Sequence, residues 1–347
     1  MKKKIILSFL AILIVSGFYF AWKIFGPGTS FSGQKYNLFI RTGMNFNAEM
    51  KILREDNVLE SPSLFSWLAA RLDYPKNIKA GKYEIKKGVS LADLIRMLRN
   101  GRQTPVNLVI TKFRTKEDLS GYVGKRYECD SSSFMNYLQN SDSLREFGLD
   151  SNTVMTAVFP DTYTLFWNMT PSRIFRKLYN NYKAYWTPGR EKEAADHGLT
   201  PVTAYILASL VEEETNKAED RPVIASVYLN RIGKGMKLDA DPTIKYALRQ
   251  FELKRIYEKY LAVESPYNTY KYPGLPPGPV CTPSRQSLEA VLTAPKTNYI
   301  YFVARPDFSG YSNFSENFSQ HLVYAKAYQK ALDAEMAKRA AGEDTIK

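Results

Sequence analysis

Three consecutive glutamates at residues 212–214 are the side chains in this sequence best suited to acid–base chemistry. They end an apolar run that starts with Thr200 and Pro201, a pair typical of a helix start because Thr caps free N–H groups and Pro fits the first turn. We therefore predict a helix over residues 202–215. A carboxyl held among the apolar side chains of such a helix loses hydration, which raises its pKa toward the range that a general acid needs near neutral pH.

The three glutamates take different positions around the predicted helix, at about 100° per residue. Glu214 falls between Leu207 and Leu210 on the apolar face. Glu213 falls at the edge of that face, and Glu212 falls on the opposite side, toward solvent. Spacing alone leaves both Glu213 and Glu214 open as the acid, and by itself it favours a third interpretation, a solvated helix end with no catalytic role.

The composition of the chain argues against several other classes of function. The 347 residues include 48 Lys and Arg against 35 Asp and Glu, so the net charge is +13 and a basic surface should favour polyanions or anionic lipid headgroups. No zinc-finger spacing or arginine-rich run supports nucleic acid as a partner. The two histidines, His197 and His321, are too few for a multi-His metal site, and Cys129 and Cys281 are too far apart for a CxxC motif. We expect neither a metal nor a cofactor.

The first 25 residues predict a membrane anchor. Three lysines at 2–4 precede a charge-free run of 18 residues, 5–22, which as a helix would span about 27 Å. The lysines should stay in the cytoplasm, which would place the remainder on the periplasmic side of the inner membrane. A cleaved signal peptide is the alternative, but bulky side chains at 18–22 stand where cleavage needs small ones. We expect a cytoplasmic tail at 1–4 and a transmembrane helix at 5–25.

The rest of the chain divides into a short linker and two folded parts. Residues 26–33 are rich in Gly, Pro and Ser and predict the linker. Residues 34–110 combine strand and helix patterns into a small α/β module, with Ser90 as the cap of a helix that ends at Asn100. Helical patterns prevail over residues 111–347. The predicted fold class is α+β: a transmembrane helix, a small α/β module, and a mainly helical domain with a small sheet.

Several ordered motifs in residues 150–325 closely resemble those of the YceG-like endolytic murein transglycosylase family. They read Ala-Ser-Leu-Val-Glu-Glu-Glu-Thr at 208–215, Ala-Ser-Val-Tyr-Leu-Asn-Arg at 225–231, Asp-Pro-Thr at 241–243, Tyr-Asn-Thr-Tyr at 267–270 and Gly-Leu-Pro-Pro-Gly-Pro at 274–279. Phe-Pro-Asp-Thr-Tyr at 159–163 and the spacing from Phe314 to His321 match as well. The strand–turn–helix at 80–101 resembles the LysM-like module that the family carries at this position, with a spacer that lifts the active domain off the membrane as the alternative.

The resemblance implies an activity and assigns the acid. The family's catalytic residue is the second Glu of its Glu-x-Glu-Thr motif, which is Glu214 here. Family members cleave the bond after N-acetylmuramic acid in peptidoglycan glycan strands, and the sugar's own 6-hydroxyl acts as nucleophile, which leaves 1,6-anhydro ends. Glu214 would first protonate the leaving oxygen and then take a proton from the 6-hydroxyl. The resemblance also implies that the chain trims or terminates nascent strands near cell-wall synthases.

Five polar residues of these motifs are candidates for binding sugar hydroxyl and acetamido groups: Asn230, Asp241, Thr243, Asn268 and Tyr270. Each has a structural alternative; Asp241, for example, stands where it could simply start a helix. The Gly-Leu-Pro-Pro-Gly segment should form a rigid loop along one wall of the groove, because Pro fixes φ and Gly permits turns.

Two other function classes stay open. A non-catalytic peptidoglycan-binding scaffold at the membrane would use the glutamates only as structural groups. A different membrane-anchored hydrolase, such as a peptidase, is disfavoured because the sequence holds neither a Gly-x-Ser-x-Gly nor a His-Glu-x-x-His motif. Digestion of cell wall separates the three classes, since anhydro ends, reducing ends and no cleavage identify a transglycosylase, a hydrolase and a binder.

Overall fold

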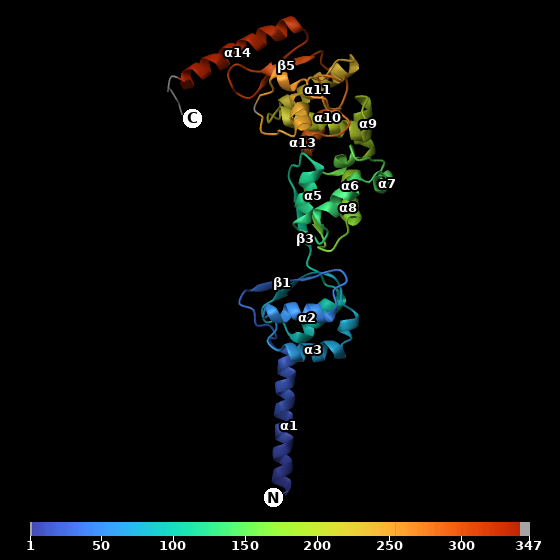
Figure 1. Ribbon diagram of the computed structural model, residues 1–347, viewed down its shortest axis with the longest axis vertical. Coiled ribbons are helices and arrows are strands. Elements are labelled where there is room, and N and C mark those ends of the chain that lie inside the picture. The colour runs from blue at the N-terminus through green and yellow to red at the C-terminus, as the bar shows by residue number, and fades with distance from the viewer. Residues whose placement is uncertain (1, 254, 341–347) are drawn as a thin grey trace. The chain divides into compact units, whose positions relative to one another are not determined.

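The computed structural model describes residues 2–253 and 255–340, which form two compact units (Figure 1). Within that range, the N-terminal unit is built from residues 2–108, 123–130 and 164–170, and the C-terminal unit from the remainder. The chain thus contributes three separate segments to each unit, whereas the sequence prediction placed one linear boundary after residue 110.

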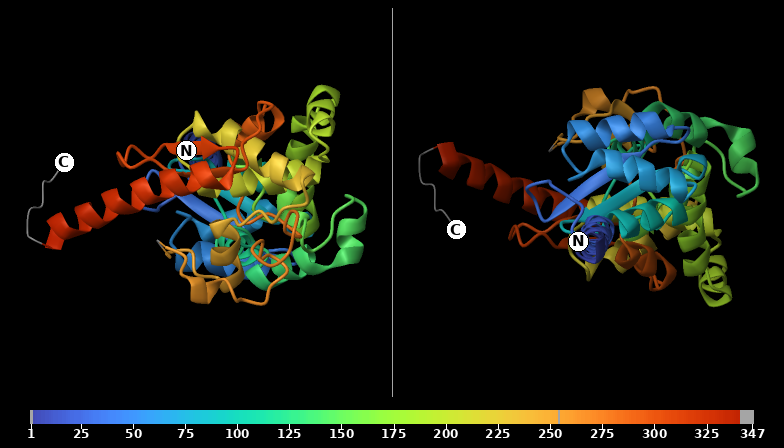
Figure 2. Two further views of the ribbon diagram at one scale, coloured as in Figure 1. Left: turned by 90° about the horizontal axis from the view of Figure 1, so that it is seen from above. Right: turned by 90° about the horizontal axis from the view of Figure 1, so that it is seen from below.

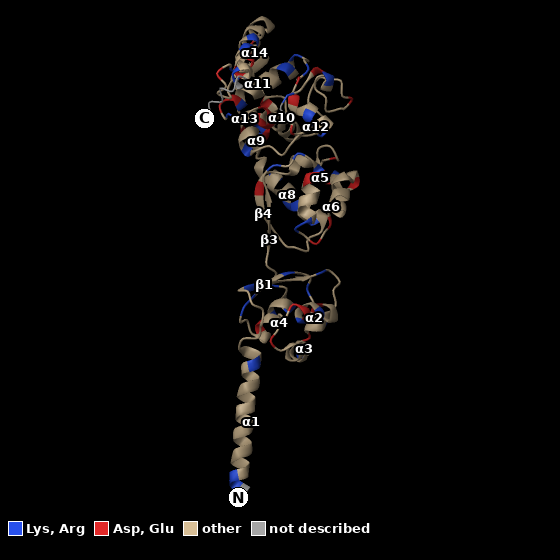
Figure 3. Cartoon of the chain, turned by 60° about the vertical axis from the view of Figure 1, so that its left-hand side comes forward, with Lys and Arg blue, Asp and Glu red and all other residues tan. Residues whose placement is uncertain are grey.

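The first element, α1 (Lys2–Phe25), is a single uninterrupted helix, seen end-on in Figure 2. Its segment Lys3–Phe25 includes an 18-residue window with a mean hydropathy of 2.3 and no buried residue. Among the described residues it is the one helix long and apolar enough to cross a membrane. Charged side chains lie near its two ends, with Lys23 near the second, and uncharged residues lie between them (Figure 3). The helix is compatible with the predicted single-pass anchor.

The N-terminal unit pairs two strands and covers them with short helices. The antiparallel strands are β1 (Lys35–Ile40) and β2 (Gly81–Lys86), and the helices are α2 (Phe46–Glu55), α3 (Pro62–Arg71), the 3-10 helix η1 (Tyr74–Lys76) and α4 (Leu91–Asn100). Ser90 caps α4 by accepting a hydrogen bond from the N–H of Asp93, and Gly101, at φ 68°, ends it, which confirms the predicted bounds of this helix. Inward side chains of both strands and all four helices form one apolar core.

Helices dominate the remainder of the described chain. In order, its elements are β3 (Val106–Ile110), α5 (Lys116–Gly124), α6 (Ser131–Gln139), α7 (Ser141–Arg145), η2 (Val154–Ala157), β4 (Asp161–Leu165), α8 (Pro171–Tyr185), α9 (Pro188–Asp196), α10 (Pro201–Glu214), α11 (Asp220–Gly233), α12 (Asp241–Leu248), η3 (Glu258–Tyr260), α13 (Arg285–Leu292), β5 (Tyr301–Ala304), β6 (Ser312–Ser315) and α14 (Phe318–Ala340). α10 is the central helix of the C-terminal unit, because α9, α11, α12 and α13 all pack against it.

A small antiparallel sheet and the last helix complete the C-terminal unit. β5 pairs with β6, with Phe302 opposite Phe314, and α14 packs against both strands. The C-terminal half of α14 extends away from the other elements of its unit (Figure 2). The described part of the chain therefore has the predicted mixed, helix-rich composition with small sheets.

Candidate active site

The helix that carries the three glutamates, α10, is surrounded by other helices. Thr200 accepts a hydrogen bond from the N–H of Thr203 at 3.2 Å and Pro201 is the first helical residue, which confirms the predicted helix start. All residues from 204 to 211 are buried. The helix therefore has almost no solvent face, and the prediction that Glu212 points toward solvent is wrong, since only 14% of its side chain is exposed.

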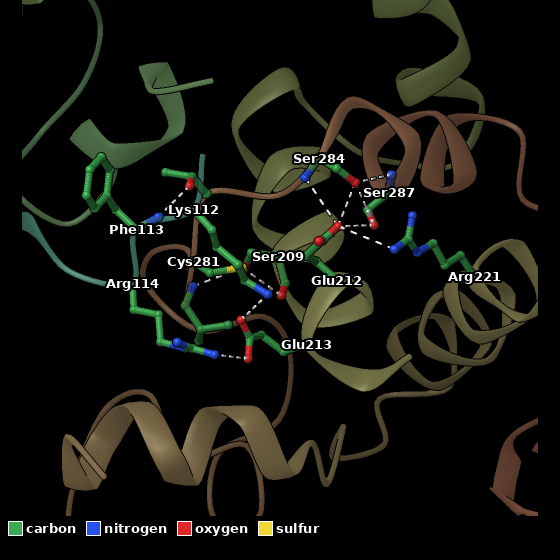
Figure 4. Close-up of polar contacts among 12 residues, drawn as sticks. Lys112, Phe113, Arg114, Ser209, Glu212, Glu213, Arg221, Cys281, Ser284 and Ser287 are labelled. Carbon is green, nitrogen blue, oxygen red and sulfur yellow. Dashed lines mark hydrogen bonds and ion pairs between the residues drawn. The ribbon is translucent and has the colours of Figure 1, made fainter. Parts of the chain in front are cut away.

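Glu212 holds the start of α13 against α10 (Figure 4). Its Oε2 accepts hydrogen bonds from the N–H of Ser284 at 3.2 Å, the hydroxyl of Ser284 at 2.6 Å and the hydroxyl of Ser287 at 2.6 Å. Burial alone would raise the pKa of this carboxyl, but the serine hydrogen bonds and the charge of Lys112 bring it below its usual range. Glu212 is therefore an ionised structural group at neutral pH.

Glu213 is neutralised by two cations from the segment before α5. Lys112 Nζ lies 2.7 Å from its Oε1 and Arg114 Nη2 lies 3.1 Å from its Oε2 (Figure 4). Although burial acts in the opposite direction, these two partners lower the pKa of Glu213. A carboxylate held ionised in this way is a poor proton donor at neutral pH.

Glu214, the last residue of α10, lines a cavity of about 360 Å³ within the C-terminal unit. Its Oε1 accepts a hydrogen bond of 2.6 Å from the hydroxyl of Tyr228, a buried residue of α11. The other residues that line the cavity are Arg231, Leu238, Asp239, Asp241, Tyr270, Tyr301, Phe302, Phe318 and His321. A partly exposed carboxyl thus faces a space large enough for part of a ligand.

Burial raises the pKa of Glu214 to about 7. The hydrogen bond from Tyr228 and the charge of Lys245 lower this pKa, whereas the negative charge of Asp241 raises it. The position of Glu214 at the C-terminal end of α10 also disfavours a carboxylate, because the carbonyl end of a helix carries partial negative charge. Glu214 can therefore hold a proton near neutral pH and release it to a ligand.

Aromatic rings form one side of this cavity. The rings of Tyr301 and His321 are stacked, with centroids 5.1 Å apart at 22°, and Phe318 lies 5.8 Å from the same tyrosine ring. Burial and the nearby charge of Arg231 lower the pKa of His321, which favours a neutral imidazole. Flat faces of this kind suit the apolar faces of sugar rings.

Arg231 ties the aromatic side of the cavity to the loop before α12. Its Nε donates to the carbonyl of Ile300 at 2.7 Å, and its Nη1 donates to the carbonyl of Leu238 at 2.9 Å and to Asp239 Oδ2 at 3.0 Å. The guanidinium also lies 5.3 Å from the ring centre of Tyr301. With these contacts Arg231 fixes the shape of the cavity wall and supplies positive charge to it.

Of the five residues predicted to bind sugar, Asp241 and Tyr270 line the cavity. Asp241 is the first residue of α12, and its Oδ1 accepts a hydrogen bond of 2.6 Å from the hydroxyl of Tyr270. The structure thus brings both residues together with Glu214, while their role toward a sugar stays a prediction.

The other three predicted residues are not among those that line the cavity in the described part of the chain. Asn230 donates to the carbonyls of Thr297 and Tyr299 at 2.8 and 2.9 Å. Asn268, fully buried, donates to the carbonyls of Leu261 and Val263, and Thr243, also buried, donates to the carbonyl of Ala240 at 2.6 Å. Their side chains hold the backbone around the cavity.

The side chains of this site that sequence reasoning missed include Tyr228, Arg231, Tyr301 and Phe318. Tyr228 and Arg231 stand inside the motif at 225–231, three residues apart and so about one helical turn from each other, and a helical wheel for that segment could have placed them on one side of the helix. Tyr301 and Phe318 carry no local signal, because only the pairing of β5 with β6 and the packing of α14 bring them to Glu214.

Comparisons with known proteins agree on one family. The sequence model of the YceG-like family matches residues 38–327. A Bacillus subtilis (strain 168) protein named endolytic murein transglycosylase is 29% identical over 346 residues, 91% of each chain. A protein of the same name from Streptococcus pneumoniae serotype 2 (strain D39 / NCTC 7466) is 26% identical over 87% of this chain, which spans 61% of that protein.

A solved structure is similar as well. The crystal structure of a YceG-like protein from Listeria monocytogenes aligns with a TM-score of 0.54 at 25% identity, over 84% of this chain and 98% of that one. Because the family match extends over most of the sequence and includes all residues of the cavity, the chain belongs to the YceG-like family.

Proposed function

We propose that this chain is a membrane-anchored endolytic murein transglycosylase in which Glu214 is the single catalytic acid and base. The names of the Bacillus and Streptococcus relatives support the activity. The observation that carries the assignment is the Glu214 carboxyl itself, which lines a cavity, accepts a hydrogen bond from Tyr228 and has a pKa raised to about 7. The neighbouring glutamates are committed to other partners.

The first step is protonation of the leaving oxygen. The proton on Glu214 passes to the glycosidic oxygen after N-acetylmuramic acid as the bond to C1 breaks, which leaves the carboxylate and an oxocarbenium-like centre. Tyr228 donates to Oε1, so we place the transferred proton on Oε2. The same hydrogen bond stabilises the carboxylate that forms, because a hydrogen bond to the charged form favours it.

The second step returns the proton to Glu214. The 6-hydroxyl oxygen of the same muramic residue forms a bond to C1, and the Glu214 carboxylate takes its proton, which regenerates the acid and gives a 1,6-anhydro end. No water is consumed. The aromatic side formed by Tyr301, Phe318 and His321 supports this route, since it would cover one face of the sugar and limit the access of water.

The five predicted sugar-binding residues divide into two groups in this proposal. Asp241 and Tyr270 line the cavity and would contact hydroxyl or acetamido groups directly. Asn230, Thr243 and Asn268 are bonded to the backbone and would act indirectly, by holding the walls.

A glycoside hydrolase is the second candidate, and one observation favours it. Asp241 lines the same cavity as Glu214, and the third carboxyl of the cavity, Asp239, is paired with Arg231. Glu214 and Asp241 could therefore form the pair of carboxyl groups that most glycosidases use. In that case Asp241 would activate a water molecule or attack C1, and the product would be a reducing end.

Mass spectrometry of the products separates the two functions. We expect the full chain to release anhydro-muropeptides from uncross-linked glycan strands, and Asp241→Asn to retain that product with a reduced rate. Incorporation of ¹⁸O from labelled water into reducing ends would instead establish the hydrolase, and Asp241→Asn should then abolish cleavage.

The remaining features support a place at the cell envelope. The helix α1 would anchor the chain in the inner membrane with its lysines in the cytoplasm, and the C-terminal unit would then trim or terminate nascent strands near synthases on the periplasmic side. Residues 34–110 would act as a LysM-like module that binds glycan. A reporter that is active only outside the cytoplasm should be active when it is fused after Lys347, and an inactive reporter would contradict the proposed orientation. Deletion of residues 34–110 should weaken retention of the chain on purified cell wall, and equal retention would contradict a glycan-binding role for this module.

A further inference from the structure

A second cavity of about 290 Å³ lies in the C-terminal unit, apart from the cavity that Glu214 lines. Its walls come from the start of α5, the segment before η2, the end of α12 and the loop at 265–267, with Pro279 of the Gly-Leu-Pro-Pro-Gly-Pro motif. None of the residues that line it line the first cavity, so the proposed reaction assigns it no role.

Two cations, Lys116 and Arg249, line this cavity. Lys116 is partly buried, and its Nζ donates to the carbonyl and the hydroxyl oxygen of Ser151, both at 2.7 Å, so one of its three N–H donors remains for a ligand. No ion pair within 4 Å joins Lys116 to a described carboxylate. Arg249 lies 3.9 Å from Glu117, too far for a hydrogen bond, and that glutamate does not line the cavity.

Tyrosines and a closely packed loop form the rest of the wall. The rings of Tyr246 and Tyr267 lie 4.5 Å apart, and the Arg249 guanidinium lies 4.7 Å from the first of these rings. Gly278 approaches so closely that a Cβ there would lie 2.2 Å from the carbonyl oxygen of Asn152 and 2.7 Å from the hydroxyl of Tyr267. Any residue larger than glycine at 278 would displace Asn152 or Tyr267, both of which line the cavity.

The walls of the two cavities share two structural elements. α12 begins with Asp241 at the first cavity and ends beside Arg249 at the second, which are about 12 Å apart along the helix. The loop at 265–270 likewise contributes Tyr267 to the second cavity and Tyr270 to the first. A ligand seated beside Asp241 would have to extend by about 12 Å, a little more than the length of two sugar rings, to contact Arg249.

We propose that the second cavity binds a carboxylate of the peptide attached to a muramic acid residue of the strand. The proposal rests on the proposed function, and it specifies that the substrate is peptide-bearing rather than stripped glycan. Muramic acid is the one sugar of the strand that carries a peptide, and that peptide presents carboxylates next to amide groups. Lys116 and Arg249 would pair with a carboxylate, while Tyr246 and Tyr267 would pack against the peptide chain.

Binding of two defined strands to the full chain tests this inference. The Glu214→Gln chain in lipid nanodiscs is mixed with labelled linear glycan strands that carry stem peptides, or with the same strands after an amidase has removed the peptides. Lys116→Met and Arg249→Gln are introduced singly and together. Arg249→Gln is the safer variant, because its side chain is 49% exposed and lies outside the core. Arg145→Gln is the control, because it also removes the cation of an ion pair, in α7, although the Arg145 side chain is more exposed, at 80%.

We expect the parent chain to bind the peptide-bearing strand roughly five- to tenfold more tightly than the stripped strand. The double variant should lose most of that difference, Arg249→Lys should keep most of it, and Arg145→Gln should not change it. Equal affinity for both strands, or a preference that survives the double variant, would overturn the inference while leaving the proposed function intact. Failure to bind either strand would contradict both, and competition by inorganic phosphate as strong as that by free stem peptide would indicate a general anion site instead.

Discussion

Two glutamates that lie in different units of the molecule share nearly the same local chemistry, since each carboxyl accepts a hydrogen bond from a tyrosine hydroxyl. Glu49 in α2 accepts hydrogen bonds from the hydroxyl of Tyr74, at 2.7 Å to each carboxyl oxygen, and Glu214 accepts one from Tyr228 at 2.6 Å. Burial raises the pKa of both carboxyls to about 7. Their surroundings differ, because the Glu49 residue is 0% exposed within an apolar core, whereas Glu214 lines a cavity.

The difference teaches that a raised pKa and a tyrosine partner do not by themselves identify a catalytic acid. A buried acid with no route to a ligand contributes only to stability, and its proton responds only to folding. The same pair of groups beside a cavity can pass its proton to a substrate. The two sites differ in whether a ligand can reach the carboxyl. The helices around α10 and the sheet of β5 and β6 together form the cavity that gives a ligand access to Glu214.

The largest expected effect is on activity. Glu214→Gln keeps the shape of the side chain but removes its proton, so the rate of strand cleavage should fall by about 10²- to 10⁴-fold. Glu49→Gln, the matched variant, should cleave at close to the wild-type rate per folded molecule. Cleavage is measured by chromatography of strand lengths. A comparable loss of cleavage rate in both variants would mean that the cavity does not make Glu214 functionally different from Glu49.

The next effect is on the pH dependence of stability. Between about pH 4.5 and pH 7, Glu49 is protonated in the folded chain but ionised in the unfolded chain, because its pKa is raised to about 7 on folding. The unfolded chain therefore binds fewer protons in this range, so the free energy of unfolding should fall as the pH rises from about 4.5 to about 7 and then level off. For Glu49 the change is on the order of 3 kcal/mol at most. Urea unfolding of Glu49→Gln from pH 4 to 8 should lack this component, and a slope identical to that of the wild type would contradict the assignment.

A smaller effect should distinguish the neighbours of Glu214. Glu212→Ala removes the acceptor of three hydrogen bonds at the start of α13 and should lower the free energy of unfolding by about 1–3 kcal/mol. Glu213→Gln, which weakens the pairing with Lys112 and Arg114, should cost about 1–2 kcal/mol. Both folded variants should retain cleavage within about tenfold of wild type; a loss as deep as that of Glu214→Gln would reassign the acid.

The smallest effects are two opposite shifts in the pH profile of kcat/KM. Tyr228→Phe removes a hydrogen bond that lowers the pKa of Glu214, so the decline in activity on the alkaline side should move to higher pH. Asp241→Asn removes a negative charge that raises this pKa, so the decline should move to lower pH. Each shift should be less than about one pH unit. Shifts in the same direction would show that the profile does not report Glu214.

Local signals predicted much of the fold. Thr200 with Pro201 marked the start of α10 and Ser90 marked the start of α4, because caps and first-turn residues act on their own helix. The helical wheel failed for Glu212, because it assumes that one side of a helix meets solvent, and α10 is enclosed by four helices. Its partners Ser284 and Ser287 are over seventy residues away in sequence, beyond the reach of any local pattern.

The site itself was predictable only in part. Motif order pointed to Glu214, Asp241 and Tyr270, which the structure brings to one cavity. Asn230, Thr243 and Asn268 stand in the same motifs, yet they bond to backbone carbonyls. A motif does not separate a side chain that faces a ligand from one that holds the wall behind it.

The most direct test of the central claim is a titration of the Glu214 carboxyl itself. Carbonyl spectra of the ¹³C-glutamate-labelled full chain, taken by infrared spectroscopy as a difference against Glu214→Gln, isolate this group between pH 3 and 9. We expect a protonated carboxyl that titrates near pH 7, together with the decline in release of anhydro products. Titration near the usual value of about 4.3, with full activity retained well above it, would contradict the account.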